Sequence, residues 1–190
     1  MGRLKSIIIK SIAVVFGEIL VHLYGDILKV KSKIIHTKNG LKKDLLITIY
    51  ERKLYKLGSW IGYNSVIEKN PVFPHGIQGI FISCEAHIGA NCVIFQQVTI
   101  GSNSIPQHVR NGSPTIGDNC YIGAGAKIIG RVTIGDNCRI GANCVVVKDI
   151  PDNCVVVQSS PRIIQKENLD NKYSRNSTNN TADGRPMSSS

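Results

Sequence analysis

Residues 116–151 repeat one six-residue phrase almost without interruption: IGDNCY, IGAGAK, IIGRVT, IGDNCR, IGANCV and VVKDIP. An aliphatic residue opens each unit, and a small or β-branched residue usually follows four places later. A period of six suits neither an amphipathic helix nor an ordinary alternating strand. Short fixed periods are typical of solenoids, whose stacked coils bury a core that no single repeat could bury.

The phrase predicts a triangular prism in which each six-residue unit forms one flat face. The opening aliphatic residues point inward: Ile116, Ile122, Ile128, Ile134, Ile140 and Val146. Gly and Asn make the corners because they tolerate the backbone angles of tight turns. The repeat begins loosely at residues 61–72 and is interrupted at 73–80. It breaks again at 102–114, which we expect to project from a corner as a functional loop.

The stretches PHGIQGIFISCEAHIGANCVIFQQVTIG (residues 74–101) and SPTIGDNCYIGAGAKIIG (residues 113–130) carry a resemblance to a known family. They resemble the hexapeptide-repeat acyltransferases, and among these the serine acetyltransferase subfamily with its relatives encoded beside capsule genes. The resemblance covers residues 60–163. It implies a mainly β fold, a left-handed parallel β-helix, with acetyl-CoA as acyl donor, and a homotrimer whose donor groove lies between neighbouring prisms.

Moving an acetyl group to a hydroxyl requires a base, and histidine suits that role because its pKa lies near neutrality. Of the five histidines, His22 and His36 lie in N-terminal segments without a site context, and His87 takes a solvent-facing place in a repeat. His75 stands where the repeat is interrupted, between Pro74 and Gly76. In the resembling family a histidine at the matching position is the catalytic base. A purely structural turn histidine is the alternative.

Two family carboxylates are missing. The aspartate that orients the base falls at Trp60, and the one that holds an amino-acid acceptor falls at Pro74. Glu85 or a backbone carbonyl is our hypothesis for what orients His75 instead. The loss at Pro74 weakens serine and favours a sugar hydroxyl, so both acceptors stay open.

The remaining site predictions come from the resemblance. His108 and Arg110, in the projecting loop, are predicted to bind the acceptor across a subunit boundary, although their spacing to Pro114 departs from the family's and simple solvent exposure is the alternative. The pantetheine arm would lie along small-residue coils, and basic side chains would meet the phosphates. These donor-binding residues are Gly123, Ala124, Gly125, Ala126, Gly141 and Ala142, with Lys127, Lys148 or Arg162 as the basic ones. Coil packing is the alternative reason for the small residues.

Net charge and cysteine content limit the partners, metal sites and cellular location that fit this sequence. The net charge is +10, and residues 1–60 hold twelve Lys and Arg against four Asp and Glu. A solvated basic face explains this excess more simply than nucleic acid, which we do not expect as a partner. Five of the six cysteines follow an asparagine, and no C-x-x-C pair exists, so we expect free thiols, no metal and a cytoplasmic location.

Residues 1–59 precede the repeat. Residues 7–30 form an amphipathic pattern with too many charges for a spanning helix. Packing on the prism or on a neighbouring subunit is one interpretation of its apolar stripe, and contact with the anionic inner face of a membrane is the other. Residues 44–50 (DLLITIY) are expected to form a short strand, and residues 164–190 a disordered polar tail.

Three classes of function follow. The first is an acetyl-CoA-dependent O-acetyltransferase, acting on serine or on a sugar such as a capsular polysaccharide. The second is a metalloenzyme like the γ-class carbonic anhydrases, which the wide separation of the histidines disfavours. The third is a non-catalytic scaffold, supported by the missing aspartate and opposed by the intact turn at His75.

Overall fold

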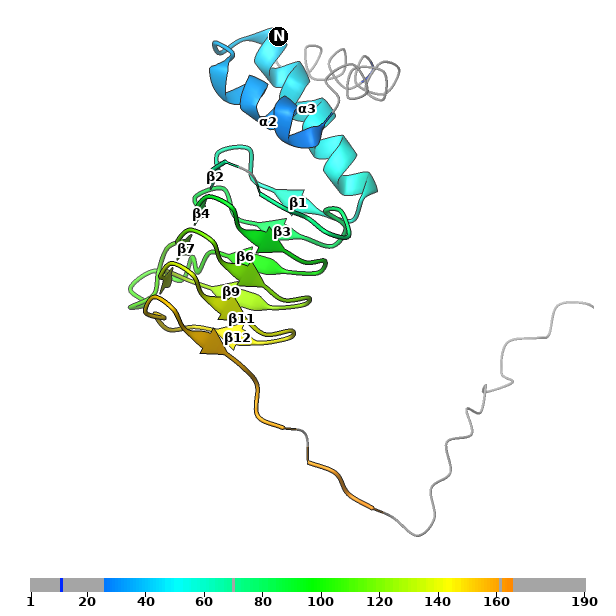
Figure 1. Cartoon of the computed structure of the whole chain (residues 1–190). Helices are drawn as coiled ribbons and strands as arrows, with labels where there is room; N and C mark the ends of the chain where they lie inside the picture. Colours follow the sequence, from blue (N-terminus) through cyan, green and yellow to red (C-terminus); the bar gives the residue numbers. More distant parts are fainter. Residues whose placement is uncertain (1–10, 12–25, 70, 161, 166–190) are drawn as a thin grey trace, which may run out of the picture. The chain divides into compact units, whose positions relative to one another are not determined.

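The computed structural model describes residues 11, 26–69, 71–160 and 162–165 (Figure 1). Most of the amphipathic stretch 7–30 and of the predicted tail 164–190 therefore lies outside the described residues. Those up to Gln158 form one compact unit, and those from Ser159 onward belong to a second one that is considered by itself.

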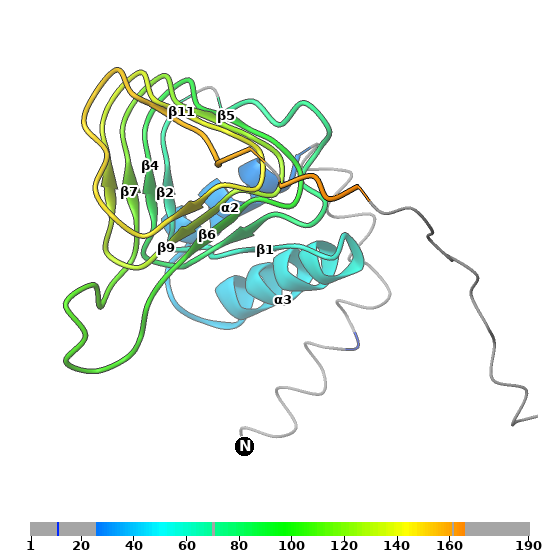
Figure 2. The ribbon, with the colours of Figure 1, turned by 90° about the horizontal axis from the view of Figure 1, so that it is seen from below.

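Three parallel sheets built from very short strands make up the β domain (Figure 2). Sheet A contains β1 (Trp60–Ile61), β3 (Phe81–Ile82), β6 (Thr99–Gly101), β9 (Lys127–Ile129) and β12 (Val145–Val146). Sheet B contains β2 (Val66–Ile67), β4 (His87–Ile88), β7 (Thr115–Ile116) and β10 (Thr133–Ile134). Sheet C contains β5 (Val93–Ile94), β8 (Tyr121–Ile122), β11 (Arg139–Ile140) and β13 (Val155–Val156). The chain visits A, B and C in turn, so each coil is one triangular rung.

The core is the inward column of aliphatic side chains that the repeat predicts. The six that open the units at 116–151 are at most 2% exposed. Cys92, Cys120, Cys138 and Cys144 are equally buried beside them, where a free thiol serves as a compact apolar side chain. In-register stacking explains this arrangement, because Ile88 pairs with Ile116, and Ile116 with Ile134, on successive coils.

Three corners connect the sheets, and we name each by the sheets it joins. The CA corner, from sheet C to sheet A, comprises residues 73–80, 95–98, 123–126 and 141–144. The AB corner includes residues 83–86, 102–114, 130–132 and 147–149. Residues 102–114 project from this corner as a loop (Figure 2), closed at its base by an antiparallel bridge between Asn103 and Gly112.

Two helices cover the first coil, α2 (Ile27–His36) and α3 (Leu41–Lys56). The strand predicted at 44–50 is wrong, because these residues lie inside α3. Its buried side chains are Leu46, Ile49, Tyr50 and Leu54, a helical spacing that the β-branched residues of DLLITIY obscured. The Tyr50 hydroxyl donates to the Ile61 carbonyl oxygen at 2.8 Å and so fastens α3 to β1.

Asp26, read from the sequence as a charge that interrupts the apolar stretch, is a helix N-cap. Its carboxylate accepts a hydrogen bond from the Leu28 amide at 3.1 Å, and α2 begins at the next residue. None of the helices among the described residues combines the length and apolarity needed to cross a bilayer.

Candidate active site

His75 lies on the CA corner, in the longest of its four turns. Gly76 and Gly79 take φ values of 72° and 70°, which glycine adopts without strain. The Gly76 amide closes the turn by donating to the Phe73 carbonyl oxygen at 3.0 Å. The predicted non-standard turn is therefore present, and it exposes the imidazole at the surface.

Gln96 holds one side of that imidazole. The bridge between Val72 and Val93 sets the register of the first two coils, so His75 stacks on Gln96, three residues further along each coil. His75 Nδ1 lies 2.7 Å from Gln96 Oε1, and the ring meets that of Phe95 edge to face at 5.6 Å between centroids. Glu85 does not orient His75 within one chain, because Glu85 lies on the AB corner, at the opposite edge of sheet A.

The predicted donor-binding residues continue the same corner. The Gly125 amide donates to the Gln96 carbonyl oxygen at 3.0 Å, and the Asn143 amide donates to the Ala124 carbonyl oxygen at 2.9 Å. His75, Gln96, Ala124 and Ala142 therefore form a ladder of residues at equivalent places on successive coils.

Coil packing accounts for two of the glycines. A Cβ on Gly123 would lie 2.7 Å from the Ala142 nitrogen, and one on Gly125, which has φ of 71°, would collide with the Asn143 side chain. Both glycines are buried, whereas Ala124 is half-buried and Ala142 exposed. Gly141 is half-buried as well and Ala126 is fully buried, so a ligand on the corner could touch Ala124, Gly141 and Ala142.

The basic residues are spread more widely than predicted. Lys127 lies beside the ladder, where its Nζ donates to the Gln97 carbonyl oxygen at 2.7 Å. Lys148 is exposed on the AB corner, away from the ladder in the same chain. Arg162 is exposed and belongs to the second unit.

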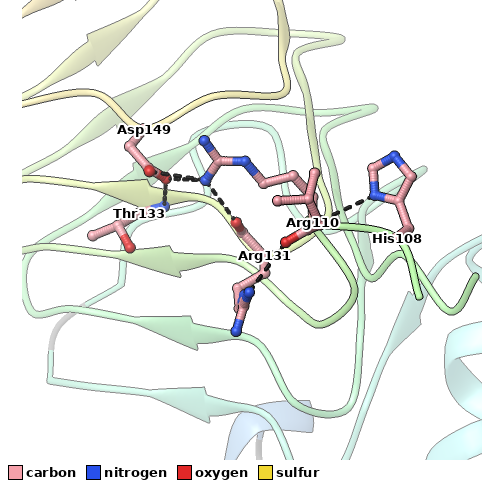
Figure 3. Close-up of polar contacts among 6 residues, drawn as sticks. His108, Arg110, Arg131, Thr133 and Asp149 are labelled. Atoms are coloured by element: carbon pink, nitrogen blue, oxygen red, sulfur yellow. Dashed lines mark hydrogen bonds and ion pairs between the residues drawn. The ribbon is translucent and has the colours of Figure 1, made fainter. Parts of the chain in front are cut away.

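Arg110 anchors the projecting loop to its own chain (Figure 3). Its Nη1 lies 2.7 and 2.8 Å from the two carboxylate oxygens of Asp149, and 3.1 Å from the carbonyl oxygen of Arg131. The guanidinium holds the pKa of the Asp149 carboxyl below its usual value, and the Thr133 amide, which donates to Oδ1 at 2.9 Å, adds to the effect.

Backbone and side-chain contacts fix His108 in turn. Its Nδ1 accepts the Arg110 amide at 3.0 Å (Figure 3), which places the ring proton on Nε2. Asn103 Nδ2 approaches the same atom at 3.0 Å. His108 and His75 lie at opposite edges of sheet A, so one chain does not bring them together.

Sequence reasoning missed Gln96 and Asp149. The six-residue period contains a signal for Gln96, because it places residues 96, 124 and 142 at the same position of successive turns. His75 occupies that position as well, but the interruption of the period at 73–80 concealed this. Asp149 carries no sequence signal, since its partner is 39 residues away. Among the described residues, no group of three or more His, Cys, Asp or Glu could hold a metal ion.

The family described as bacterial transferase hexapeptide (six repeats) matches residues 113–148. Residues 113–148 of the β domain therefore match the hexapeptide-repeat family. The fold, a left-handed parallel β-helix, is confirmed, and so is the resemblance to serine acetyltransferases.

The sequence is similar to curated serine acetyltransferases. It is 35% identical to the serine acetyltransferase of Bacillus pumilus over 127 residues, which are 60% of this chain and 57% of that protein. It is 40% identical to the enzyme of Synechococcus elongatus over 95 residues, covering 50% of this chain and 38% of that one. The chain thus spans about half the length of the curated relatives it matches.

Solved structures of serine acetyltransferases are also similar to this chain. Serine acetyltransferase isoform 3 of Entamoeba histolytica, in complex with cysteine, superposes with a TM-score of 0.59 at 32% identity, covering 74% of this chain and 50% of that one. The Neisseria gonorrhoeae serine acetyltransferase, in complex with serine, gives 0.59 at 28% identity, covering 70% and 53%.

Proposed function

We propose that this protein is an acetyl-CoA-dependent O-acetyltransferase of the serine acetyltransferase type, with serine as its acceptor. The observation that carries the proposal is the corner ladder, which sets an exposed imidazole directly above coils of small residues. Similarity to serine acetyltransferases in sequence and in structure supports the same activity. No metal is part of this chemistry.

In the proposed reaction, His75 takes and returns one proton. His75 Nε2, free of the contact made by Nδ1, removes the proton of the acceptor hydroxyl while its oxygen attacks the thioester carbonyl. The tetrahedral intermediate collapses by breaking the carbon–sulfur bond. The imidazolium then returns its proton to the departing thiolate, leaving the acetyl ester and free coenzyme A.

The donor would lie along Ala124 and Ala142, with its thioester toward His75. Lys127, whose Nζ lies beside the ladder at the Gln97 carbonyl oxygen, is the basic side chain that we propose for the phosphates. Lys148 and, from the second unit, Arg162 stay predictions for the same role.

A homotrimer is part of the proposal. His75 is on the CA corner, whereas His108, Arg110 and Lys148 are on the AB corner. Packing the CA corner of one copy against the AB corner of the next would combine both sets in one groove, and a closed ring would form three such grooves.

A cytoplasmic location fits the buried thiols. Membrane contact through residues 7–30 stays a prediction, since most of that stretch lies outside the described residues.

The test is thiol release from acetyl-CoA by the purified protein, offered serine and, separately, simple sugars. We expect release with serine and a loss of about 10²–10⁴ in kcat on changing His75→Ala, because the general base is removed. His87→Ala is the matched control, since His87 is exposed on sheet B. Release with a sugar but not with serine would show that the acceptor is a sugar hydroxyl. No release with any acceptor would refute the enzymatic proposal.

A further inference from the structure

The Gln96 side chain forms a hydrogen bond with His75, and Gln96 itself is held in place by the coil stacking. Its side chain is half-buried, and its carbonyl oxygen accepts the Gly125 amide at 3.0 Å. The neighbouring Val98 is fully buried. The amide therefore projects from a rigid corner, at the place where the coil register puts His75 above it.

The contact determines where the imidazole carries its proton. A carbonyl oxygen can only accept, so Gln96 Oε1 at 2.7 Å requires a hydrogen on His75 Nδ1. The lone pair of a neutral imidazole is then on Nε2, the atom that points away from the corner. Edge-to-face contact with Phe95 restricts rotation of the same ring.

We propose that Gln96 is the positioning residue for His75: it fixes the Nδ1–H tautomer and the ring orientation in the place of a carboxylate. The catalytic consequence rests on the proposed function, but the tautomer does not. An amide supplies the acceptor without a negative charge, so this site orients its base without an ion pair to the imidazolium that forms during transfer.

Imidazole ¹⁵N NMR of the full-length protein, without substrate, tests the positioning itself. We expect the His75 signals, assigned by their absence in His75→Asn, to show Nδ1–H at neutral pH. Gln96→Asn shortens the side chain by one methylene, and Gln96→Leu removes the acceptor, so both should shift the ring toward the Nε2–H form. Gln96→Glu keeps an acceptor and should retain Nδ1–H. Gln97→Asn, next along the chain and already at φ of 62°, is the matched control.

Kinetics test the consequence for catalysis. Gln96→Asn should lower kcat about 10–100-fold with little change in KM, the loss typical of an outer partner that orients a functional histidine. Gln96→Glu should restore most of kcat. It should also move the acid limb of kcat/KM to higher pH, because a carboxylate stabilises the protonated ring and the base must be neutral to act.

The outcomes separate the two proposals. An unchanged tautomer in both Gln96→Asn and Gln96→Leu would overturn the role of Gln96, as would an unchanged kcat. A shifted tautomer in a protein whose wild type turns over no acceptor would overturn the proposed function, while supporting Gln96 as the residue that orients the ring.

Discussion

Asparagine takes the left-handed place at several corners of this chain, where glycine takes it at others. Five of the seven non-glycine residues with positive φ in the described ranges are asparagines, which tolerate the left-handed region better than other side chains. They are Asn91, Asn119, Asn137, Asn143 and Asn153. Asn137, with φ of 57°, also donates from its backbone to the Asp118 carbonyl oxygen at 2.9 Å, so the turn and the coil stacking depend on one conformation.

Asn137→Ala should therefore destabilise the protein by about 1 kcal/mol, the cost of holding a Cβ in the left-handed region without the local help of an asparagine. Urea unfolding followed by circular dichroism would measure this loss. Asn64→Ala removes the same groups at an exposed site outside the positive-φ set and should change little. Equal effects at the two positions would refute the backbone explanation.

The projecting loop, residues 102–114, is an irregular element held by contacts with regular ones. The Arg131 amide donates to the Arg110 carbonyl oxygen at 2.9 Å, and Arg131 Nη2 donates to the Val109 carbonyl oxygen at 3.1 Å. Asp149 adds the ion pair to Arg110 from two coils further along the chain. The loop is thus tethered at its C-terminal half, next to His108.

Asp149→Asn should loosen this half of the loop. An asparagine Oδ1 can still accept the Thr133 amide, so the change removes mainly the charge that holds Arg110. We expect faster tryptic cleavage after Arg110, whose side chain becomes free to enter the protease. Asp152→Asn is the control, because that carboxylate accepts a backbone amide, from Asp136, without an arginine. Equal cleavage of wild type and Asp149→Asn would contradict the tether.

The same ion pair makes the tether sensitive to acid. Arg110 lowers the pKa of Asp149 in the folded state, so the contribution of the pair is complete above the unfolded pKa of about 3.9 and is lost as pH falls through the folded value. Hydrogen-exchange protection of the Arg131 and Thr133 amides, corrected for intrinsic rates, should drop in that acid range. Asp149→Asn should abolish the pH dependence.

At the scale of the whole molecule, the β-helix leaves the side chains of the proposed site on two separate edges. His75, the proposed base, is on one edge of sheet A and the tethered loop is on the other, and the helices α2 and α3 cover the first coil. A complete site therefore requires a second copy under the proposed trimer.

Mixing two inactive variants tests this arrangement. If sites are shared, His75→Ala and His108→Ala subunits refolded together should recover activity at about a quarter of the interfaces, where both wild-type residues meet. Each variant refolded alone should stay weak. Full activity of His108→Ala alone, or a mixture no better than either parent, would contradict a shared site.

The sequence by itself determined the repeating architecture, because aliphatic residues six positions apart are buried together when the coils stack. It also singled out His75, whose Pro-His-Gly context departs from the repeat. Sequence reasoning misassigned residues 44–50 as a strand, because local β-propensity competed with a helical spacing that only packing against the first coil selects.

Tertiary structure alone decided which side chains meet. The pairing of His75 with Gln96 depends on how the extra residues at 73–80 fit into one turn, and that of Arg110 with Asp149 on where the loop returns. Neither is local in the chain, at 21 and 39 residues' separation. A period specifies the register between coils, but interruptions of the period are shaped by contacts, so the functional groups they carry are positioned only once the coils have stacked.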